Sequence, residues 1–595
     1  MDLQNPNEDP NLERRLMLAI ALTVLLFLIV LPFMNKKSQM PPVPVATKSA
    51  AQPAPAPAPA ATTPGAPAPA KPGAAKPAPP PAVIQAAAEQ TIAVNTPVYH
   101  VIFSNRGAVA RSWILAHYRD DAGRPLNVID PTFSNEFGYP LAFWSADPAV
   151  RQELSQALYQ VAQTAGPGGT HTITFTWAGH GWTATKTITF DPSYLVDIRA
   201  RVTHNGQDVP MALAWQGAFG DRAVPGDFDT EQLFYQNGSG VKTVAAKDVH
   251  NGNASEGIYQ FTGVEDKYFA LIFLPAGAPA LTITDLSSKY QPRLTDASGN
   301  IITNQQVTTV GLAIAAGGAF HTRLFVGPKR IGLLGGIDPA LRGLVDFGWF
   351  TFIAEPLFLW MKWTYTHWIH NYGWAILFLT FVITMATFPL KMKAQKNSAK
   401  MMAVQPKINA LNAKMKKYGL RDPRRQEVQQ EIMKVYSDHG VNFLGGCLPM
   451  FVQLPVIYAF WRVLDYAIEL RHAPWIGFYH DLSARDPYFV LPLLVVLTQF
   501  FVMSMMPTMP GQDPRQQKMM KWLMPIMMGW FFFYLPAGVN LYYLGSNIIG
   551  AGQQWVANRT YNAAAVAAVA ARDARDAKTT GKGKAIEGKV AGPKP

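Results

Sequence analysis

One cysteine, Cys447, occurs in this chain of 595 residues, so no internal disulfide is possible. The sequence also lacks a phosphate-binding Walker pattern, a zinc-binding His-Glu-x-x-His pattern and a Gly-x-Ser-x-Gly nucleophile turn. Cys447 stands at the head of an apolar segment with no identifiable base beside it, which favours a small buried residue over a nucleophile. We therefore expect a protein that is not an enzyme and that holds neither a cofactor nor a metal.

Charged residues are scarce, at 15% of the chain, and long stretches contain almost none. The hydrophobic residues, 49% of the total, gather in these stretches. A helix that crosses a bilayer needs about 20 mostly apolar residues. Six runs approach this length: residues 16–34, 371–390, 448–466, 489–506, 522–535 and 539–557. The predicted fold class is a polytopic α-helical membrane protein with six transmembrane helices and a separate all-β domain.

Positive charge is unevenly distributed among the loops. Three segments are basic: residues 391–443, the loop with Arg515, Lys518 and Lys521, and the tail 558–595. Residues 469–488 carry balanced charge. Cytoplasmic loops of membrane proteins carry the excess of lysine and arginine. This rule places residues 1–15 and the three basic segments in the cytoplasm and the β domain outside, and six crossings satisfy every loop at once.

The first apolar run, residues 16–34, follows Arg14 and Arg15. A cleavable signal peptide is the alternative to a retained anchor, but the run exceeds the usual apolar core and no small-residue cleavage pattern follows it. We favour the anchor. Residues 35–90 are rich in alanine and proline, a composition that cannot bury a core, so they predict an extended tether.

Residues 91–330 have the pattern of short antiparallel strands. Ile173, Phe175 and Trp177 alternate with threonines, and Val196 and Ile198 open a similar alternation. Such alternation is typical of half-buried strands, and many of them over more than two hundred residues predict a β-sandwich. His204 and His250 are interpreted as surface or core residues.

Residues 338–370 are aromatic and amphipathic, with Trp349, Trp360 and Trp368 among few charges. Tryptophan is enriched at membrane interfaces, so we expect a helix lying on the outer leaflet. A helix packed under the β domain is the alternative.

Two amphipathic helices are predicted within residues 391–443. The first carries an apolar stripe from Met401 to Tyr418 and ends at Gly419; Asp422 and Pro423 are typical of the cap and first position of the second. An antiparallel helical hairpin is the simplest structure. Its basic residues are candidates for contact with ribosomes or targeting factors: Lys400, Lys407, Lys414, Lys416, Lys417, Arg424 and Arg425. The alternative is a solvated loop that only obeys the positive-inside rule. We expect the tail 558–595 to be disordered and either to help hold ribosomes or only to keep this end soluble.

Short motifs in one order give the chain a specific resemblance. They are Asn371-Tyr372-Gly373-Trp374, Phe388-Pro389-Leu390, Gln405-Pro406-Lys407, Leu444-Gly445-Gly446-Cys447, Gln453-Leu454-Pro455, Glu469-Leu470-Arg471, His480-Asp481-Leu482-Ser483, Asp486-Pro487-Tyr488 and Leu541-Tyr542-Tyr543. With Phe325-Val326-Gly327-Pro328, the chain resembles the Gram-negative members of the YidC/Oxa/Alb family. The resemblance implies an inner-membrane protein with a periplasmic β-sandwich and a five-helix core. It also implies a role in inserting and folding nascent membrane proteins, alone or beside the Sec translocon and targeting factors.

Polar residues inside the apolar runs suggest a groove. Thr380, Thr384 and Thr387 fall on one helical face, as do Asn540, Tyr543 and Asn547 in the last run. With Gln453 and Tyr542 they predict a polar, water-reaching groove in the membrane. The alternative is that the threonines bond their own backbone and the other polar residues hold helices together.

Such a groove would assist insertion without fuel. Moving a charged residue to the bilayer centre costs roughly 2.5–3.5 kcal/mol, and a hydrated slot lowers that barrier. The short run 522–535 also predicts local thinning of the surrounding lipid. Burial of substrate apolar surface then supplies the driving force.

One position departs from the family pattern. Where family members typically carry arginine or lysine, this chain has Thr384, and residues 371–390 hold no charge. Arg462 is the possible substitute, but it lies off the face of Gln453, and Asp465 at i+3 is its expected partner. We therefore expect weaker attraction of acidic substrate segments.

Two rival functions use the same features. A secondary transporter would also place polar residues at mid-membrane, but no repeated pair of broken helices is present. A membrane-tethered carbohydrate-binding or epimerase-like protein is compatible with the sandwich alone. Deleting the β domain separates these readings, because an insertase should keep much of its activity.

Overall fold

The computed structural model describes residues 83–120, 123–221, 231–238, 240–277, 280–292, 306–419, 422–440, 448–505 and 514–587. The predicted anchor 16–34, most of the tether 35–90 and Cys447 lie outside these residues. The chain divides into two units, residues 1–327 and 328–595. Each unit is described by itself.

The first unit is built from antiparallel sheets. The four-stranded sheet, in the order β1-β2-β3-β4, contains β1 (Thr91–Asn95), β2 (Tyr99–Ser104), β3 (Val109–Arg119) and β4 (Pro125–Asn127). The ten-stranded sheet, in the order β13-β12-β15-β16-β19-β9-β8-β7-β6 with β10 on β9, contains β6 (Gln160–Ala165), β7 (His171–Gly179), β8 (Trp182–Phe190), β9 (Leu195–His204), β10 (Gln207–Asp208), β12 (Gln232–Gln236), β13 (Val241–Ala245), β15 (Phe261–Glu265), β16 (Phe269–Pro275) and β19 (Phe320–Pro328).

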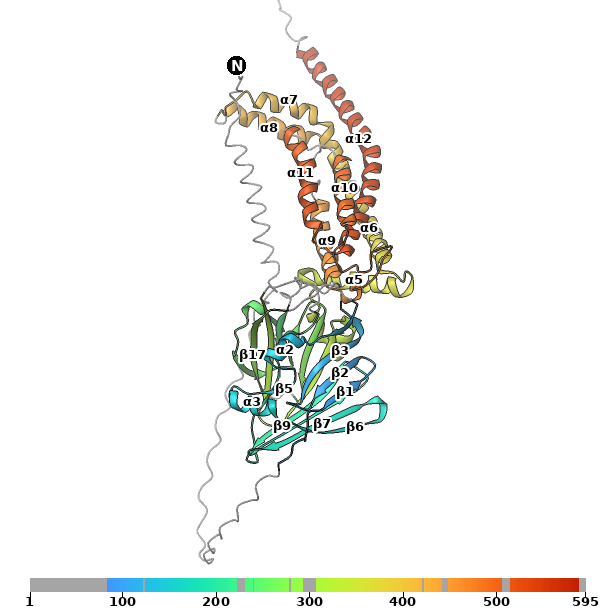
Figure 1. The fold of residues 1–595 in the computed structure, drawn as a ribbon. Coiled ribbons are helices and arrows are strands. Elements are labelled where there is room, and N and C mark those ends of the chain that lie inside the picture. The colour runs from blue at the N-terminus through green and yellow to red at the C-terminus, as the bar shows by residue number, and fades with distance from the viewer. Residues whose placement is uncertain are drawn as a thin grey trace, which may run out of the picture. The chain divides into compact units, whose positions relative to one another are not determined.

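The five-stranded sheet, in the order β14-β17-β18-β11-β5, contains β5 (Ala142–Trp144), β11 (Ala212–Trp215), β14 (Ala254–Ile258), β17 (Ala280–Tyr290) and β18 (Val307–Ala316). Two short helices accompany the sheets, α2 (Pro131–Phe137) and α3 (Pro148–Gln156). Figure 1 shows the strands stacked in layers within this unit. The predicted alternation is confirmed, because Ile173, Phe175, Val196 and Ile198 are all at most 1% exposed on the inner faces of β7 and β9.

A lysine occupies an inward position in this apolar pattern. Lys186 follows Ala184 and precedes Ile188 on the buried face of β8, and it is fully buried. Its Nζ donates to the carbonyls of Ala108 (2.9 Å) and Leu141 (2.5 Å). Burial lowers the pKa of Lys186 to about 7, because desolvation disfavours the charged amine.

The free energy of unfolding of this unit should therefore rise as the pH is raised above about 7. Above about pH 7 the unfolded chain binds a proton at Lys186 that the folded unit does not, so the free energy of unfolding rises with pH until the usual pKa of lysine near 10.5. We expect a gain of about 2 kcal/mol between pH 7.5 and pH 9. Urea unfolding of residues 83–327, followed by tryptophan fluorescence, measures it.

The matched control is Lys186→Met, which cannot titrate at this position. Its own stability falls, since the Ala108 and Leu141 carbonyls lose their donor, but its dependence on pH between 7.5 and 9 should be flat. A wild-type curve as flat as that of Lys186→Met would contradict a neutral buried lysine.

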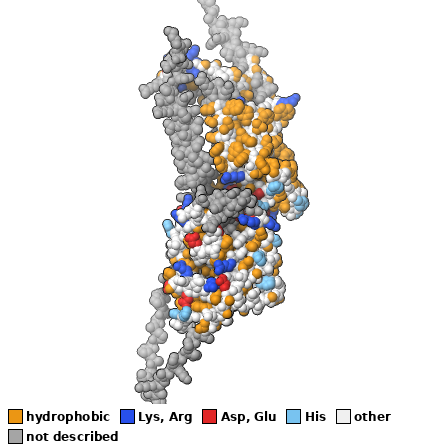
Figure 2. All heavy atoms as spheres, in the orientation of Figure 1, with side chains coloured by type: hydrophobic (Ala, Val, Ile, Leu, Met, Phe, Trp, Pro, Cys, Tyr) orange, Lys and Arg blue, Asp and Glu red, His pale blue; other side chains and the backbone are white. Residues whose placement is uncertain are grey.

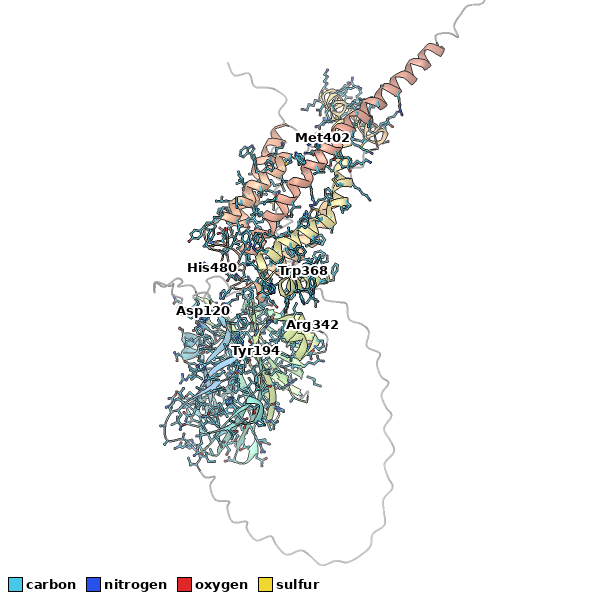
Figure 3. The ribbon with its side chains drawn as sticks, turned by 90° about the vertical axis from the view of Figure 1, so that its right-hand side faces the viewer. Asp120, Tyr194, Arg342, Trp368, Met402 and His480 are labelled. Atoms are coloured by element: carbon cyan, nitrogen blue, oxygen red, sulfur yellow. The ribbon has the colours of Figure 1, made fainter. Side chains whose placement is uncertain are left out.

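The second unit is helical. Its helices are α4 (Ile331–Ile337), α5 (Thr351–His367), α6 (Tyr372–Ala403), α7 (Gln405–Met415), α8 (Pro423–Asp438), α9 (Leu448–Tyr466), α10 (Val490–Met505), α11 (Pro514–Phe532) and α12 (Ala537–Glu587). α12 packs along α6 and α10, α11 packs on α10, and α9 packs on α5. Figure 3 places Trp368 and His480 at one end of this unit and Met402 at the other.

Among the described helices, α6 alone is long and apolar enough by composition to cross a membrane, with a mean hydropathy of 1.9 in its most apolar window. Val490–Met505 is a shorter apolar helix. Large hydrophobic side chains remain exposed along the unit, including Leu497 on α10 and Ile526 and Trp530 on α11. Figure 2 shows such side chains gathered over the surface of the helices. An exposed apolar surface of this extent is expected where lipid replaces water as the solvent.

Two helices extend beyond the predicted crossings. α6 continues past residue 390 to Ala403, because lysine, alanine, glutamine and methionine all favour helix. It ends just before α7, which begins at Gln405 and has Pro406 in its first turn. α12 continues to Glu587, so the predicted disordered tail is wrong up to that residue. The many alanines after Asn562 explain this, since alanine has the highest helix propensity.

Candidate functional site

Amide side chains on α12 attach it to its neighbours. Asn540, Asn547 and Asn558 are separated by seven and eleven residues, so they lie on one stripe of the helix. Asn540 Nδ2 donates to the carbonyls of Phe532 (3.1 Å) and Leu535 (3.3 Å), at the end of α11. These amides therefore hold helices together, which is the alternative considered for the predicted groove residues.

The other two members of the stripe face α10. Asn547 Nδ2 lies 3.2 Å from Thr498 Oγ1 and 3.4 Å from the Val495 carbonyl, and Asn558 Nδ2 donates to the Met505 carbonyl at 2.9 Å. Asn547 is half-buried, so one side of this contact remains accessible.

Gln553 faces the other way, toward α6. Its Nε2 donates to the Thr384 carbonyl at 3.1 Å, and the residue is only 8% exposed. Its Oε1 is buried without a hydrogen-bond partner among the described residues. An unpaired buried acceptor is costly, so a polar group that enters the bundle beside Thr384 would be stabilised there.

Gln553 is not among the groove residues predicted from the sequence. An amide inside the otherwise apolar run 539–557 was the available signal, but Gln553 lies on a different face from Asn540 and Asn547. Only the contact with α6, which joins residues 169 positions apart, shows its role.

Two of the three threonines of α6 contact α12, since Thr380 lies beside Gly545 and the Thr384 carbonyl bonds Gln553. Thr380 and Thr384 are buried, and Thr387 is half-buried. Thr380 Oγ1 donates to the Ile376 carbonyl (2.7 Å), and Thr387 Oγ1 donates to the carbonyls of Ile383 and Thr384 (both 3.1 Å). Two of the three hydroxyls are thus satisfied within their own helix. Gln553 bonds the main-chain carbonyl of Thr384 and not its hydroxyl.

The remaining predicted groove residues are dispersed. Asn540 lies about 20 Å along α12 from Gln553, given 1.5 Å per residue, so it is not level with Thr384. Tyr542 is buried against Phe460 of α9 with ring centroids 4.7 Å apart, and Tyr543 is half-buried and packs on Phe532 of α11 at the same distance.

Gln453 is half-buried on α9. No hydrogen bond joins it to Thr384 or Asn547 within the described parts of the chain. The structure therefore brings Thr384 and Gln553 together and pairs Asn547 with Thr498, and among the described residues no hydrogen bond joins Gln453 to either contact.

Arg462 has a different partner from the expected one. Its guanidinium bonds the Asp346 carbonyl (2.7 Å), lies 3.2 Å from the Asp346 carboxylate and stacks 3.8 Å above the Tyr466 ring. The predicted pairing with Asp465 is wrong, because the side chain lies over Tyr466 and reaches Asp346 in the segment before α5. Arg462 is buried in this contact and does not replace a groove cation.

The motif Asn371-Tyr372-Gly373-Trp374, at the start of α6, contacts the loop between α9 and α10. Asn371 caps α6 by accepting from the Trp374 amide, and its Nδ2 donates to the carbonyls of Pro474 and Trp475. A Cβ on Gly373 would lie 2.2 Å from the Trp475 ring, so only glycine permits this approach. The motif Asn371-Tyr372-Gly373-Trp374 therefore has a structural role.

The basic hairpin has the predicted cap, since Asp422 accepts from the Arg424 amide at the start of α8. The hydrogen bond from the Arg424 side chain also lowers the pKa of Asp422. Val404, Ile408 and Tyr436 form the core between the helices, with Val569 of α12 packed against it.

The basic residues predicted to contact ribosomes or targeting factors differ in exposure and in whether an acidic side chain pairs with them. Lys416 and Lys417 are exposed and have no acidic partner among the described residues. Lys414 lies 3.5 Å from Glu431, and Arg424 pairs with Asp422 at 2.8 Å. Lys407 and Arg425 are half-buried, and Lys400 lines a cavity described below.

Comparison with known proteins agrees with both units. Residues 363–564 match the family described as 60Kd inner membrane protein, and residues 91–360 match the YidC periplasmic domain. The chain is 32% identical over 495 residues to the membrane protein insertase YidC of Syntrophus aciditrophicus, covering 79% of this chain and 85% of the relative. It is 31% identical over 486 residues to that of Geobacter sulfurreducens, covering 79% and 86%. An active YidC insertase crystal structure with the first transmembrane domain resolved aligns with a TM-score of 0.34 and 16% identity, over 79% of this chain and 93% of that one.

Proposed function

This chain belongs to the YidC family of membrane protein insertases, and from that premise we propose that it inserts nascent inner-membrane proteins along the contact between α6 and α12. It is a bacterial inner-membrane protein with a periplasmic β domain and a helical core. The observation that supports the proposed path is the Gln553–Thr384 contact, where a buried amide oxygen is unpaired.

The proposed path lowers the cost of moving polar segments. A substrate N–H or hydroxyl that passes Thr384 can donate to Gln553 Oε1, which replaces part of its lost hydration. Thr384, Thr387 and Gln553 would contact the segment, while Thr380, Asn540 and Tyr542 support the packing. Asn547 faces α10, Tyr543 faces α11 and Gln453 lies on α9, so their contact with substrate is proposed outside this helix pair. The substrate's own hydrophobicity drives insertion, without nucleotide hydrolysis and without enzymatic chemistry.

The proposed topology has six crossings, with both termini in the cytoplasm. The anchor 16–34 leads out to the β domain, and α6, α9, α10, α11 and α12 form the five-helix core. α5 would lie at the outer interface, as its exposed Phe352 (73%) and the exposed Trp349 (50%) and Trp368 (61%) on either side of it support.

The proposed partners contact the cytoplasmic face. Lys416 and Lys417 are exposed at the end of the hairpin, where a ribosome or another acidic surface can approach them. Targeting factors, the Sec translocon and membrane lipids are further proposed partners.

Site-specific photocrosslinking tests the path. A crosslinker at Thr384 or Gln553 should capture a ribosome-bound, half-inserted single-span protein, whereas one at Val382, which faces about 200° away from Thr384 along α6, should not. A crosslinker at Asn540 should give a weaker product, because Asn540 lies about 20 Å along α12 from Gln553 and bonds the end of α11. Equal capture from Val382 and Gln553 would place the substrate elsewhere, even in cells that the protein rescues from insertase depletion.

A further inference from the structure

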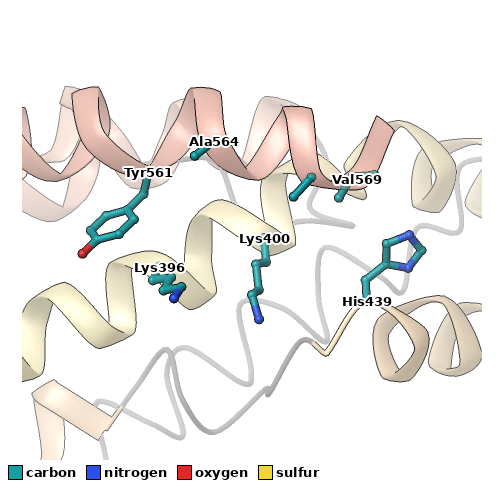
Figure 4. Close-up of a pocket in the computed structure, with 7 residues that line it drawn as sticks. Lys396, Lys400, His439, Tyr561, Ala564 and Val569 are labelled. Atoms are coloured by element: carbon teal, nitrogen blue, oxygen red, sulfur yellow. The ribbon is translucent and has the colours of Figure 1, made fainter. Parts of the chain in front are cut away.

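A cavity of about 290 Å³ lies where α6, the end of α8 and α12 meet. Its lining residues are Lys396, Lys400, His439, Tyr561, Ala564, Ala568 and Val569. Figure 4 shows the two lysines on α6 below Tyr561, Ala564 and Val569 of α12, with His439 at the opposite end. The volume is close to the lower end of the range, about 300–1,000 Å³, in which proteins hold small ligands.

The positive charge of the cavity lining indicates that the cavity binds an anion. No acidic side chain lines it among the described residues, and neither lysine has an acidic partner there. Lys400 Nζ lies 3.5 Å from the Gly440 carbonyl, and Tyr561 adds a hydroxyl to the lining. Two amines with no internal counter-ion on one wall favour a phosphate or carboxylate.

The opposite wall indicates that the anion is attached to an apolar body. Ala564, Ala568 and Val569 present only methyl groups to the cavity, and Val569 continues into the apolar core of Val404 and Ile408. A free inorganic ion would gain nothing from this wall, whereas the glycerol and first methylenes of a phospholipid would be removed from water there.

The position along α6 also favours a lipid. Lys396 is 24 residues after Tyr372, about 36 Å at 1.5 Å per residue. The hydrocarbon core of a bilayer is about 30 Å thick, and the head groups extend the total to about 40–45 Å. If α6 enters at its amino-terminal end, as proposed above, the Lys396 amine lies at the level of the cytoplasmic phosphates.

We propose that this cavity binds the phosphodiester head group of an anionic phospholipid from the cytoplasmic leaflet. Lys396 and Lys400 contact the phosphate, and the alanine face of α12 covers the glycerol. This inference rests on the proposed membrane crossing of α6. It removes Lys400 from the set of ribosome-contacting residues and gives the tail helix a role, since binding would fasten α12 to α6 and the hairpin.

Native mass spectrometry of the full chain in mild detergent tests the proposal through lipid retention. The wild-type protein should retain phosphatidylglycerol at least fivefold more tightly than phosphatidylcholine. Lys396→Gln with Lys400→Gln should abolish that preference. The control, Lys393→Gln with Lys434→Gln, removes the same charge from exposed positions outside the cavity and should keep it.

A second variant separates the cavity from surface charge. Ala564→Phe fills the cavity and leaves both lysines, so it should also lose the preference, with its melting temperature checked to show that it folds. The proposed site would be overturned if Ala564→Phe kept the preference for phosphatidylglycerol. It would also be overturned if the control pair lost that preference as fully as Lys396→Gln with Lys400→Gln.

Competition identifies the source of the anion. Inorganic phosphate or glycerol phosphate should displace phosphatidylglycerol only at concentrations at least a hundredfold higher. Displacement at equal concentration would show a site for free phosphate, and tighter binding of an acidic helical peptide would show a protein-docking site; either result overturns the lipid proposal. Because the readout is retention, it does not depend on insertion activity.

Discussion

Replacing Asp486 with alanine is expected to disrupt the loop between α9 and α10 and to destabilise the helical unit by about 3–5 kcal/mol. The carboxylate is 2% exposed and accepts from the Tyr479 hydroxyl (3.1 Å), the Tyr488 amide (3.0 Å) and the Leu491 amide (2.7 Å). Alanine leaves these donors without an acceptor. The melting temperature of the purified protein should fall by about 10 °C.

Asp481→Ala is the matched control in the same loop. Asp481 accepts mainly from Ser483 within its own turn, so its loss should lower the melting temperature by much less. Similar losses for the two variants would show that the three bonds of Asp486 do not organise the loop.

Replacing Thr384 with arginine should raise the insertion of substrates with acidic segments by about fivefold or more. Two opposite unit charges about 4 Å apart attract by about 1–4 kcal/mol between bulk water and a protein-surface environment, and each 1.4 kcal/mol changes a rate or equilibrium tenfold. The unpaired Oε1 of Gln553 can accept from the new guanidinium, which offsets part of the cost of burying it. Translocation of a protease-sensitive acidic tail in inverted vesicles measures the change.

Two controls make this result specific. Val382→Arg adds the same charge away from Gln553 and should not increase insertion. Thr384→Arg combined with Gln553→Leu should lose most of the gain. Unchanged or poorer insertion by Thr384→Arg, with protein levels intact, would sink the idea that this position sets the attraction for acidic segments.

Local patterns predicted much of the architecture. The alternation in β7 and β9, the cap at Asp422 and the helices over the apolar runs follow from periods of two and 3.6 residues and from turn chemistry, which act over a few neighbours. The bounds of α6 and α12 were missed because charge marks the end of a crossing but does not end a helix.

The candidate site was predicted less completely, because local patterns report on near neighbours and not on contacts between separate helices. A helical stripe shows that Thr380, Thr384 and Thr387 share a face, but not that Thr380 and Thr387 bond their own backbone. The pairing of Arg462 with Asp346 joins residues 116 positions apart, and no local period indicates it.

By itself, the sequence determined the division into a β domain and a helical membrane domain, the position of the basic hairpin and the family motifs, because composition and short-range periodicity are properties of the chain. Only the tertiary structure decided which polar groups meet. It placed Gln553 against the Thr384 carbonyl, gave the Asp486 carboxylate three donors within one loop and the start of α10, and set Lys396 and Lys400 beside the tail helix. Those contacts depend on how separate helices pack, and packing is fixed by shape and burial over the whole unit rather than by neighbouring residues.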